Sequence, residues 1–225
     1  MTLLLFGGTG MIGHGALNAA LADDRVSRVI SVGRRPTGRR HPKLEEVVHA
    51  NLADLGPLAD RLAVADACLF CLGVSAAGMS EADYRRVTYD LTLSVARDLA
   101  GRNPAMTFVY VSGAGTNAES RQMWARVKGE TENALAGLPF AAVYNARPGV
   151  IQPVGGATSR TRLYRAIYTA MAPLMPLLRR AFPKSFLDTD QLGRALVEAG
   201  VAGASDRTLE VPDLQALAAR AEGQV

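Results

Sequence analysis

The chain has little cysteine: its 225 residues contain only Cys68 and Cys71. Two thiols are too few for the disulfide framework of an extracellular domain, so we expect a reducing, cytoplasmic setting. The spacing Cys-Leu-Phe-Cys also occurs in redox and zinc sites, but here it lies in an apolar run that predicts a buried strand. Residues i and i+3 of a strand point to opposite faces, which favours two core residues. His41 and His49 have no cysteine or carboxylate partner at ligand spacing, so we expect no metal.

Long apolar runs are also missing. The longest one, Leu163–Leu178, contains Arg165 and two prolines. It is shorter than the about 20 residues that a membrane-spanning helix needs. The amino-terminal apolar run stops after Phe6, and no basic leader precedes it. We therefore expect neither a signal peptide nor an integral membrane protein, although residues 163–178 fit an exposed amphipathic helix.

Acidic residues are missing from one part of the chain. Over the whole sequence, 25 lysines and arginines stand against 21 aspartates and glutamates, which is a mild excess. Residues 25–43, however, contain no acid, and six basic residues lie between Arg28 and Lys43. A nucleic-acid-binding face would interleave such residues with aromatics. A single bound phosphate explains this stretch better, so we expect no nucleic-acid partner.

The chain does contain an alternation of short apolar runs and longer segments with helical periodicity. This pattern is typical of a parallel sheet covered by helices. We predict strands at Thr2–Phe6, Arg28–Val32, Glu46–His49, Ala67–Leu72, Thr107–Val111, Ala141–Asn145 and Thr208–Val211. Right-handed crossovers favour an α/β, doubly wound sheet in the order 3-2-1-4-5-6, with 208–211 as a seventh strand.

Helices are predicted between these strands and after them. The clearest run over Ser80–Gly101, with Ser80 as the N-cap, and over Glu119–Ala136; Asp54–Ala63 is weaker. Beyond Pro148, prolines interrupt the pattern until a helix begins near Thr189. We predict one domain, 1–225, in which residues 151–190 form a small lobe that covers the substrate.

The strongest motif follows the first predicted strand and reads Gly7-Gly8-Thr9-Gly10-Met11-Ile12-Gly13. A strand, a glycine-rich turn and a helix are the context that the dinucleotide-binding fingerprint requires. The glycines keep β-carbons away from a pyrophosphate at the positive end of the helix and let helix and strand pack closely. We expect cofactor contacts from Gly7, Thr9, Gly10, Met11, Ile12 and Gly13. A tight turn in an unrelated α/β protein is the alternative.

The second signal concerns the choice of cofactor. An NAD site places a carboxylate at the end of the second strand, where it binds the adenosine ribose. This chain has Val32-Gly33-Arg34-Arg35 there instead. Guanidinium groups suit a 2′-phosphate, so Arg34 and Arg35 predict NADP(H). The alternative is a solvated basic loop, which is the reading we give to Arg39, Arg40 and Lys43.

Four more motifs follow in order: Cys71-Leu72-Gly73, Val109-Tyr110-Val111-Ser112, Val127-Lys128-Gly129-Glu130 and Arg147-Pro148-Gly149-Val150. With the glycine-rich turn, they resemble the atypical and extended short-chain dehydrogenase/reductase family, which includes NAD-dependent epimerase/dehydratase-like proteins. The resemblance covers residues 1 to about 155. Within the family, the motifs are most similar to those of the Tat-interacting oxidoreductase-like branch. It implies further cofactor contacts from Leu72, Gly73, Lys128, Pro148, Gly149 and Val150.

The same resemblance implies a catalytic centre that is incomplete in this chain. In the family, a serine polarises a substrate carbonyl, a tyrosine donates the proton, and a lysine four residues later holds the nicotinamide ribose. Ser112 and Lys128 match, but Trp124 stands at the tyrosine position, and an indole has no acid chemistry near neutral pH. Tyr164 and Tyr168, in the predicted lobe, are candidate substitutes.

Three functions remain open from the sequence. Ser112 and Lys128 favour an NADP(H)-dependent oxidoreductase that transfers a hydride to a small aromatic or carbonyl substrate with a non-standard proton donor. Trp124 favours a catalytically silent protein that senses NADP(H) or binds a partner. A sugar-nucleotide epimerase is the third reading, against which the missing phenol and the short tail count. Long fourth and fifth helices pair in many family members, so a homodimer is a further hypothesis.

Overall fold

The computed structural model describes residues 1–154 and 185–223 of the chain. Seven strands form one parallel sheet in the order β3-β2-β1-β4-β5-β6-β9. They are β1 (Thr2–Phe6), β2 (Arg28–Gly33), β3 (Leu44–Val48), β4 (Ala67–Phe70), β5 (Thr107–Val111), β6 (Ala142–Ala146) and β9 (Thr208–Leu209). The predicted doubly wound α/β fold, with its seventh strand, is confirmed.

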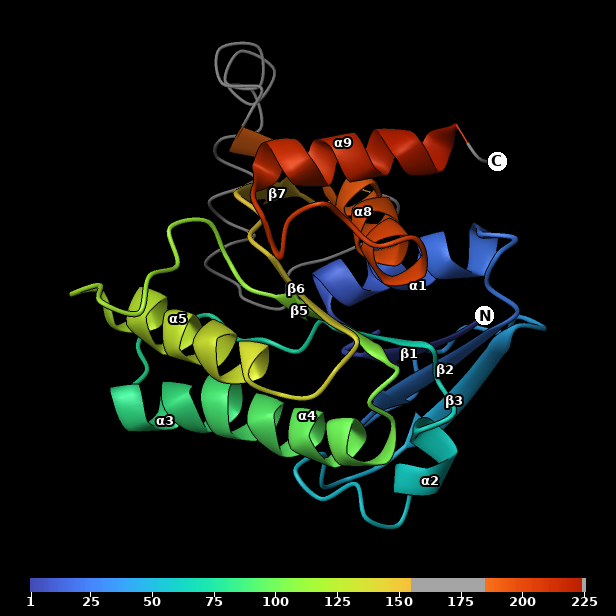
Figure 1. Cartoon of the computed structure of the whole chain (residues 1–225), viewed down its shortest axis with the longest axis horizontal. Helices are drawn as coiled ribbons and strands as arrows, with labels where there is room; N and C mark the ends of the chain where they lie inside the picture. The colour runs from blue at the N-terminus through green and yellow to red at the C-terminus, as the bar shows by residue number, and fades with distance from the viewer. Residues whose placement is uncertain (155–184, 224–225) are drawn as a thin grey trace.

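Helices cover both faces of this sheet (Figure 1). On one side lie α1 (Met11–Ala22), α8 (Thr189–Val201) and α9 (Val211–Glu222). On the other lie α3 (Glu81–Arg85), α4 (Leu91–Arg102) and α5 (Met123–Ala136), with the short α2 (Ala59–Leu62) beside α4. The central strands are therefore mostly apolar, because neither face of a covered parallel sheet meets water, whereas the edge strand β3 carries Glu45 and Glu46.

Alternate residues of each strand enter separate hydrophobic cores. Leu3 and Leu5 of β1 pack into the core that α1, α8 and α9 complete. Leu4 and Phe6 point the other way, into the core under α4 and α5. This second core contains a row of neighbouring aromatic rings from Phe6, Phe70, Phe108 and Phe140. The period of two along β1 thus assigns each side chain to a helical layer.

Several predicted boundaries differ from the structure. β3 runs from Leu44 to Val48 instead of 46–49, and the fourth strand ends at Phe70 instead of residue 72. The helix predicted over 54–63 shrinks to α2, because Gly56 and Pro57 interrupt it and the preceding residues form turns. The helix predicted from residue 119 begins at Met123.

The predicted long helix over 80–101 is not regular. Ser80 caps it as expected, since its Oγ accepts a hydrogen bond from the Asp83 amide at 3.1 Å. Between α3 and α4, however, residues Arg86–Asp90 form a π-helical turn, η1. Such turns are rare and often occur at functional sites.

A second, two-stranded sheet was not predicted. β7 (Val150–Gln152) pairs in parallel with β8 (Phe186–Asp188) at the start and end of the predicted lobe. Most of that lobe, residues 155–184, which include Tyr164, Tyr168 and the apolar stretch 163–178, lies outside the described residues. The single-domain assignment and the substrate-covering role of 151–190 stay predictions.

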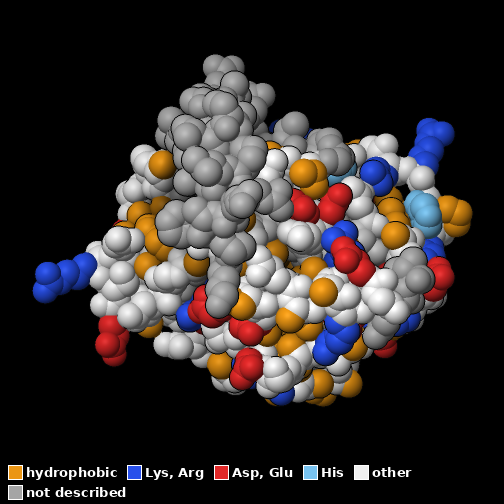
Figure 2. All heavy atoms as spheres, turned by 90° about the horizontal axis from the view of Figure 1, so that it is seen from above, with side chains coloured by type: hydrophobic (Ala, Val, Ile, Leu, Met, Phe, Trp, Pro, Cys, Tyr) orange, Lys and Arg blue, Asp and Glu red, His pale blue; other side chains and the backbone are white. Residues whose placement is uncertain are grey.

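The surface of the described residues mixes side chains of all kinds. Figure 2 shows one face, on which hydrophobic side chains are interspersed with charged side chains of both signs. Within 1–154 and 185–223, no helix combines the length and the apolar character that crossing a membrane requires.

α1 and α8 approach each other closely at a pair of glycines. A β-carbon on Gly15 would lie 2.1 Å from the Thr189 carbonyl oxygen, and one on Gly193 would lie 2.3 Å from the Gly15 carbonyl oxygen. Only glycine fits at either position. Beside the crossing is a cavity of about 220 Å³, whose lining includes Asn18 and Arg194.

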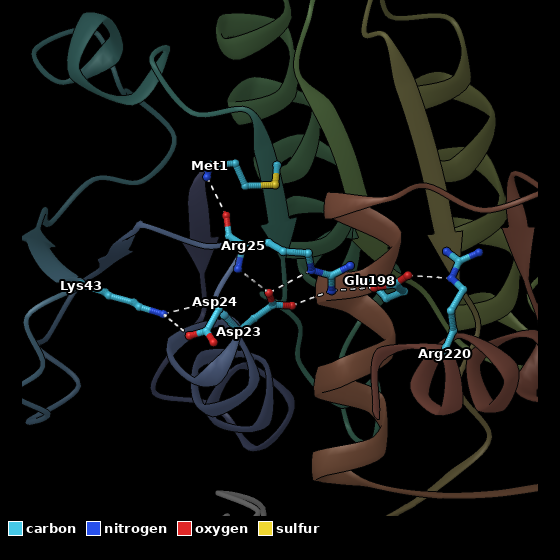
Figure 3. Close-up of polar contacts among 7 residues, drawn as sticks. All are labelled: Met1, Asp23, Asp24, Arg25, Lys43, Glu198 and Arg220. Carbon is cyan, nitrogen blue, oxygen red and sulfur yellow. Dashed lines mark hydrogen bonds and ion pairs between the residues drawn. The ribbon is translucent and has the colours of Figure 1, made fainter. Parts of the chain in front are cut away.

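A charged network joins α8 to the rest of the molecule at the amino-terminal edge of the sheet (Figure 3). The Glu198 carboxylate is fully buried and accepts hydrogen bonds from Arg25 at 2.7 Å and Arg220 at 2.6 Å. Arg25 also pairs with Asp23, and its carbonyl oxygen accepts from the terminal amine of Met1 at 2.7 Å. The network therefore ties the start of the chain to α8 and α9.

Candidate cofactor and active site

The glycine-rich turn forms a tight cradle between β1 and α1. Gly7 has a φ of +87°, and a β-carbon on it would lie 2.8 Å from the Cys71 carbonyl group at the end of β4. A β-carbon on Gly13 would lie 2.1 Å from the Gly7 carbonyl oxygen, which itself accepts from the Gly10 amide at 2.8 Å. The structure thus brings the fingerprint glycines together and places them beside the end of β4, as a pyrophosphate site requires.

The amino end of α1 offers donors for an anion. Within the described part of the chain, no side chain caps this end and its first turn carries no acidic residue. The first intrahelical bond runs from the His14 amide to the Gly10 carbonyl, so the amides of Met11, Ile12 and Gly13 precede the helical ladder. Thr9 is exposed at the mouth of the turn. These features fit a dinucleotide pyrophosphate.

The basic loop after β2 folds back over this turn. Thr37 donates hydrogen bonds from its amide and its hydroxyl to the Glu46 carboxylate on β3. Its methyl group faces the turn, since a β-carbon on Gly8 would lie 3.2 Å from Thr37 Cγ2. Arg34 and Arg35 are exposed and make no ion pair with any described residue. Their guanidinium groups are therefore free to bind an anion beside the turn.

The other basic residues of the loop behave in different ways. We expected Lys43 to be solvated, but it has partners in the protein. Its Nζ donates to the Asp23 carbonyl oxygen at 2.9 Å and lies 4.0 Å from the Asp24 carboxylate. That prediction is wrong because Lys43 directly precedes β3, from where its side chain reaches the residues that follow α1. Burial, and then the nearby charge of Arg39, lower the pKa of His14 on α1. The charge of Arg39 thus acts on the first turn of α1, which the sequence reasoning missed.

Cys68 lies in the core as the apolar run predicted, whereas Cys71 lies just beyond the strand that was expected to contain it. Cys68 is fully buried in β4, and Cys71 is partly buried just after it. Burial raises the pKa of both thiols, that of Cys71 to about 12, so neither forms a thiolate near neutral pH. Leu72 and Gly73 continue from here along the edge of the Gly7 cradle. Among the described residues there is no cluster of three histidine, cysteine or acidic side chains that could hold a metal ion.

Ser112 lies at the carboxyl end of β5, beside the end of β6. Its amide donates to the Ala146 carbonyl at 2.7 Å, and its Oγ lies 3.0 Å from Thr116 Oγ1. Thr116 in turn donates to the Gly113 carbonyl at 2.7 Å. The serine hydroxyl is therefore buried and held in place by a short loop rather than freely rotating.

Trp124 and Lys128 lie one turn apart on α5 and face this loop. The indole ring packs over Gly113 and Gly115, on which added β-carbons would lie 3.9 and 3.7 Å from it. Lys128 Nζ donates to the Val111 carbonyl oxygen at 3.2 Å and lies 5.3 Å from the centre of the Tyr110 ring. The three predicted catalytic residues are thus gathered around the end of β5.

The charge of Lys128 is poorly compensated. Burial lowers its pKa to about 8, against the opposing effect of Glu132 one turn further along α5. Glu132 is itself engaged by Arg147, whose guanidinium bonds both carboxylate oxygens at 3.0 and 2.5 Å. Arg147 also reaches Glu210 at 3.1 Å. The Glu132 carboxylate, which raises the pKa of Lys128, is therefore already hydrogen-bonded to Arg147.

The segment after β6 is fixed against the loop that follows Ser112. The Pro148 carbonyl accepts from the Ala114 amide at 3.0 Å, and Val150 starts the β7–β8 pair. A β-carbon on Gly149 would lie 2.6 Å from the Ser185 carbonyl oxygen, so glycine is needed there. These residues lie beside Ser112, which is where the resemblance places the nicotinamide end of the cofactor.

Tyrosines in the described part of the chain do not fill the place of the missing phenol. Tyr84 and Tyr110 are fully buried, and burial raises the pKa of Tyr110 far above its usual range. Tyr144 donates to the Ala204 carbonyl, and Tyr89 stacks under Arg85. Each of these rings is thus part of the packing.

Thr88 lies in the π-helical turn. It is buried, and its Oγ1 has no hydrogen-bond partner among the described residues. Its carbonyl oxygen accepts from the Thr92 hydroxyl at 2.6 Å. No sequence signal predicted that the helix would change its hydrogen-bond register at this residue.

Comparison with known proteins gives the family. No protein-family model matches the chain. It is 30% identical over 154 residues to protein fmp52-2, mitochondrial, of Aspergillus oryzae, with 67% of each chain covered. The chain belongs to the Fmp52 family. A second member, protein fmp52, mitochondrial, of Emericella nidulans, is 26% identical over 206 residues, which cover 88% of this chain and 86% of the relative.

Solved structures share the fold of this Fmp52-family chain. An oxidoreductase of the short-chain dehydrogenase/reductase family from Burkholderia thailandensis superposes with a TM-score of 0.68 at 19% identity, covering 95% of this chain and 92% of that one. The enzyme WbmF of Bordetella bronchiseptica, in complex with NAD+, gives 0.68 at 14% identity, with coverage of 99% and 77%. The chain has the NAD(P)-binding fold of these enzymes and of the NAD-dependent epimerases and dehydratases. The narrower likeness to the Tat-interacting branch is not confirmed.

One prediction is contradicted by the Fmp52 relatives. We expected a cytoplasmic setting, whereas these relatives are named mitochondrial. The expectation rested on the low cysteine count, which separates reducing from oxidising compartments. It cannot separate one reducing compartment from another, and the prediction is wrong for that reason.

Proposed function

We propose that this chain is an NADP(H)-dependent reductase of small carbonyl compounds. The observation that carries the proposal is the meeting of two sites along one edge of the sheet. The Gly7–Gly13 cradle and the free Arg34 and Arg35 lie at the ends of β1 and β2. Ser112 and Lys128 lie at the end of β5, across β4. This edge is where open α/β sheets bind their ligands.

The residues present fit a nicotinamide dinucleotide. The turn from Gly7 to Gly13 would hold the pyrophosphate with backbone amides, and Arg34 and Arg35 would bind a 2′-phosphate. Leu72 and Gly73 would line the middle of the site, while Lys128 and the segment Pro148–Val150 would hold the nicotinamide end. The bound cofactor would supply a hydride.

The protein would bind and orient the acceptor. Ser112 Oγ would donate its one hydrogen bond to a carbonyl oxygen at the end of β5 while accepting one from the Thr116 hydroxyl, which would turn away from the Gly113 carbonyl. Trp124 would offer a flat apolar wall, which favours a planar, aromatic acceptor. Residues 151–190 would cover this acceptor as a lobe of one domain, 1–225, and pairing through α4 and α5 would give a homodimer. The relatives' names support a mitochondrial setting.

The only tryptophan of the chain makes the cofactor assignment testable. NADPH bound beside Trp124 should quench its fluorescence, and a titration gives the affinity.

Charge-assisted bonds to the 2′-phosphate should favour NADPH over NADH by about 1.5–3 kcal/mol, roughly ten- to a hundredfold. Replacing Arg34 and Arg35 together by alanine should abolish the preference and leave NADH binding unchanged. Replacing Arg86 on η1 and Arg97 on α4 together by alanine removes the same two charges elsewhere and is the control. Equal affinities in the unchanged protein would refute the NADP(H) assignment.

A second function is favoured by Trp124 itself. Because an indole replaces the acidic phenol, a protein that binds NADP(H) without turnover also fits the site. Consumption of NADPH with a panel of aromatic aldehydes and quinones separates the two. Tight NADPH binding with no consumption above the buffer rate would reject the reductase and leave the silent binder.

A further inference from the structure

Among the described residues, no tyrosine stands where the resemblance expects a phenol, and an indole ring fills this place. Trp124 packs over Gly113 and Gly115, so the space beside Ser112 at this level of α5 is occupied by an indole ring. The described tyrosines are held in the packing, as shown above. A reduction at Ser112 would therefore need its proton from another group.

Lys128 is the titratable group that the geometry brings to this point. Its Nζ binds the Val111 carbonyl oxygen, one residue before Ser112. An ammonium has three donors, and this bond uses one of them. Two donors remain, and Lys128 would turn one of them toward a carbonyl oxygen held by Ser112.

The surroundings of Lys128 favour release of a proton. Tyr110 faces it from β5 through its ring, Glu132 lies one turn along α5, and Arg147 from the end of β6 occupies both oxygens of Glu132. Among residues 1–154 and 185–223, no carboxylate forms an ion pair with Lys128. Burial then lowers its pKa to about 8, which leaves it protonated near neutrality but a far better acid than an exposed lysine.

We propose that Lys128 is the proton donor of the reaction, in place of the phenol that Trp124 has displaced. The inference rests on the proposed reductase. One Nζ–H bond breaks and its proton passes to the carbonyl oxygen, while the carbonyl carbon accepts the hydride of the reduced nicotinamide dinucleotide. The products are an alcohol, the oxidised dinucleotide and a neutral Lys128 amine, which regains its proton from water.

The low lysine content allows a direct test. The chain has three lysines, Lys43, Lys128 and Lys184, so ¹³C-labelled lysine gives three signals. The signal that disappears in Lys128→Arg belongs to Lys128, and it should titrate with a midpoint near pH 8. With the full chain and saturating NADPH, kcat for phenanthrenequinone or nitrobenzaldehyde should fall about tenfold per pH unit above that midpoint.

Two variants separate a proton donor from a residue that only positions the cofactor. Lys128→Met should lower kcat by about 10²–10⁴-fold. Lys128→Arg keeps the cation and its donors but cannot release a proton, because its pKa exceeds about 12. It should restore the KM for NADPH without restoring kcat. Lys43→Arg, at a lysine remote from Ser112, is the matched control and should keep the activity.

The failure of this inference differs from the failure of the proposed function. If Lys128→Arg retains most of kcat, if kcat is level through pH 8, or if Lys128 titrates near about 10.4, Lys128 is not the donor while the reductase stands. If NADPH does not quench Trp124, the proposed cofactor is wrong. If NADPH binds and no acceptor is reduced, both proposals are overturned.

Discussion

At the scale of single residues, Lys128 is a half-buried cation without a carboxylate of its own. Its pKa in the folded chain is lowered to about 8 by burial, below the about 10.4 of an unfolded lysine. Between these two values the unfolded chain binds more protons than the folded chain. The free energy of unfolding therefore rises with pH in this window, and the penalty of burying the charge is fully present below it.

This penalty predicts that the candidate catalytic residue destabilises the fold. Lys128→Met should raise the free energy of unfolding at pH 7 by about 1–2 kcal/mol, a figure reduced for partial solvent screening. The gain should shrink as the pH rises from about 8 to about 10.4. Urea unfolding of both forms at several pH values measures it. Lys43→Met should instead lower stability, since it removes the bond to Asp23. A Lys128→Met variant less stable than the natural chain at pH 7 would contradict the argument.

At the scale of elements, the contact between α1 and α8 has no room for a side chain. Gly15→Ala would drive a methyl group against the Thr189 carbonyl and should lower the free energy of unfolding by at least about 2 kcal/mol. Gly101, near the end of α4, has no atom within 4 Å of an added β-carbon. Gly101→Ala should therefore stabilise by about 0.5–1 kcal/mol. Thermal unfolding of Gly15→Ala and Gly101→Ala measures the two effects. Equal effects of the two changes would mean that the helices separate readily.

The same scale shows what the sequence could predict. The strands and the glycine-rich turn depend on local patterns, namely apolar runs and residues without a β-carbon. The strand order follows from the right-handed crossover rule, so all three were predictable. The π-helical turn at Thr88 changes only the hydrogen-bond register inside a helical pattern, so periodicity does not detect it. β7 and β8 are three-residue strands that pair across more than thirty residues, and neither alone carries a strand signal.

The candidate site, too, has features that the sequence could predict and features that it could not. That Trp124 replaces a phenol can be read from the spacing to Lys128. That its ring packs over Gly113 and Gly115, and that Arg147 draws Glu132 away from Lys128, depends on tertiary contacts. The residue types of the candidate site were therefore predictable, whereas the electrostatic state of Lys128 was not.

At the scale of the whole molecule, the candidate site and the buried charge network of Glu198 lie at opposite edges of one sheet. Parallel strands put all their carboxyl ends on one side, where the cofactor cradle and Ser112 lie. The Glu198 network lies at the amino ends, where Arg25 and Arg220 converge on a carboxylate that has no exposure (Figure 3). It joins residues 173 apart in sequence and holds α8 and α9 to the start of the chain.

This separation predicts that the network can be weakened without loss of binding. Glu198→Gln keeps the shape but removes the charge shared by Arg25 and Arg220, and should lower the free energy of unfolding by about 2–3 kcal/mol. This loss is smaller than that of a fully buried ion pair, because the side chains of Arg25 and Arg220 are 30% and 45% exposed and water can hydrate them. The affinity for NADPH, measured by Trp124 quenching, should not change, since the cradle lies at the other edge. Arg220→Ala should cost less, as Arg25 still pairs with Glu198. A Glu198→Gln variant that kept its stability but lost NADPH binding would show that the two edges are coupled through α1 and α8.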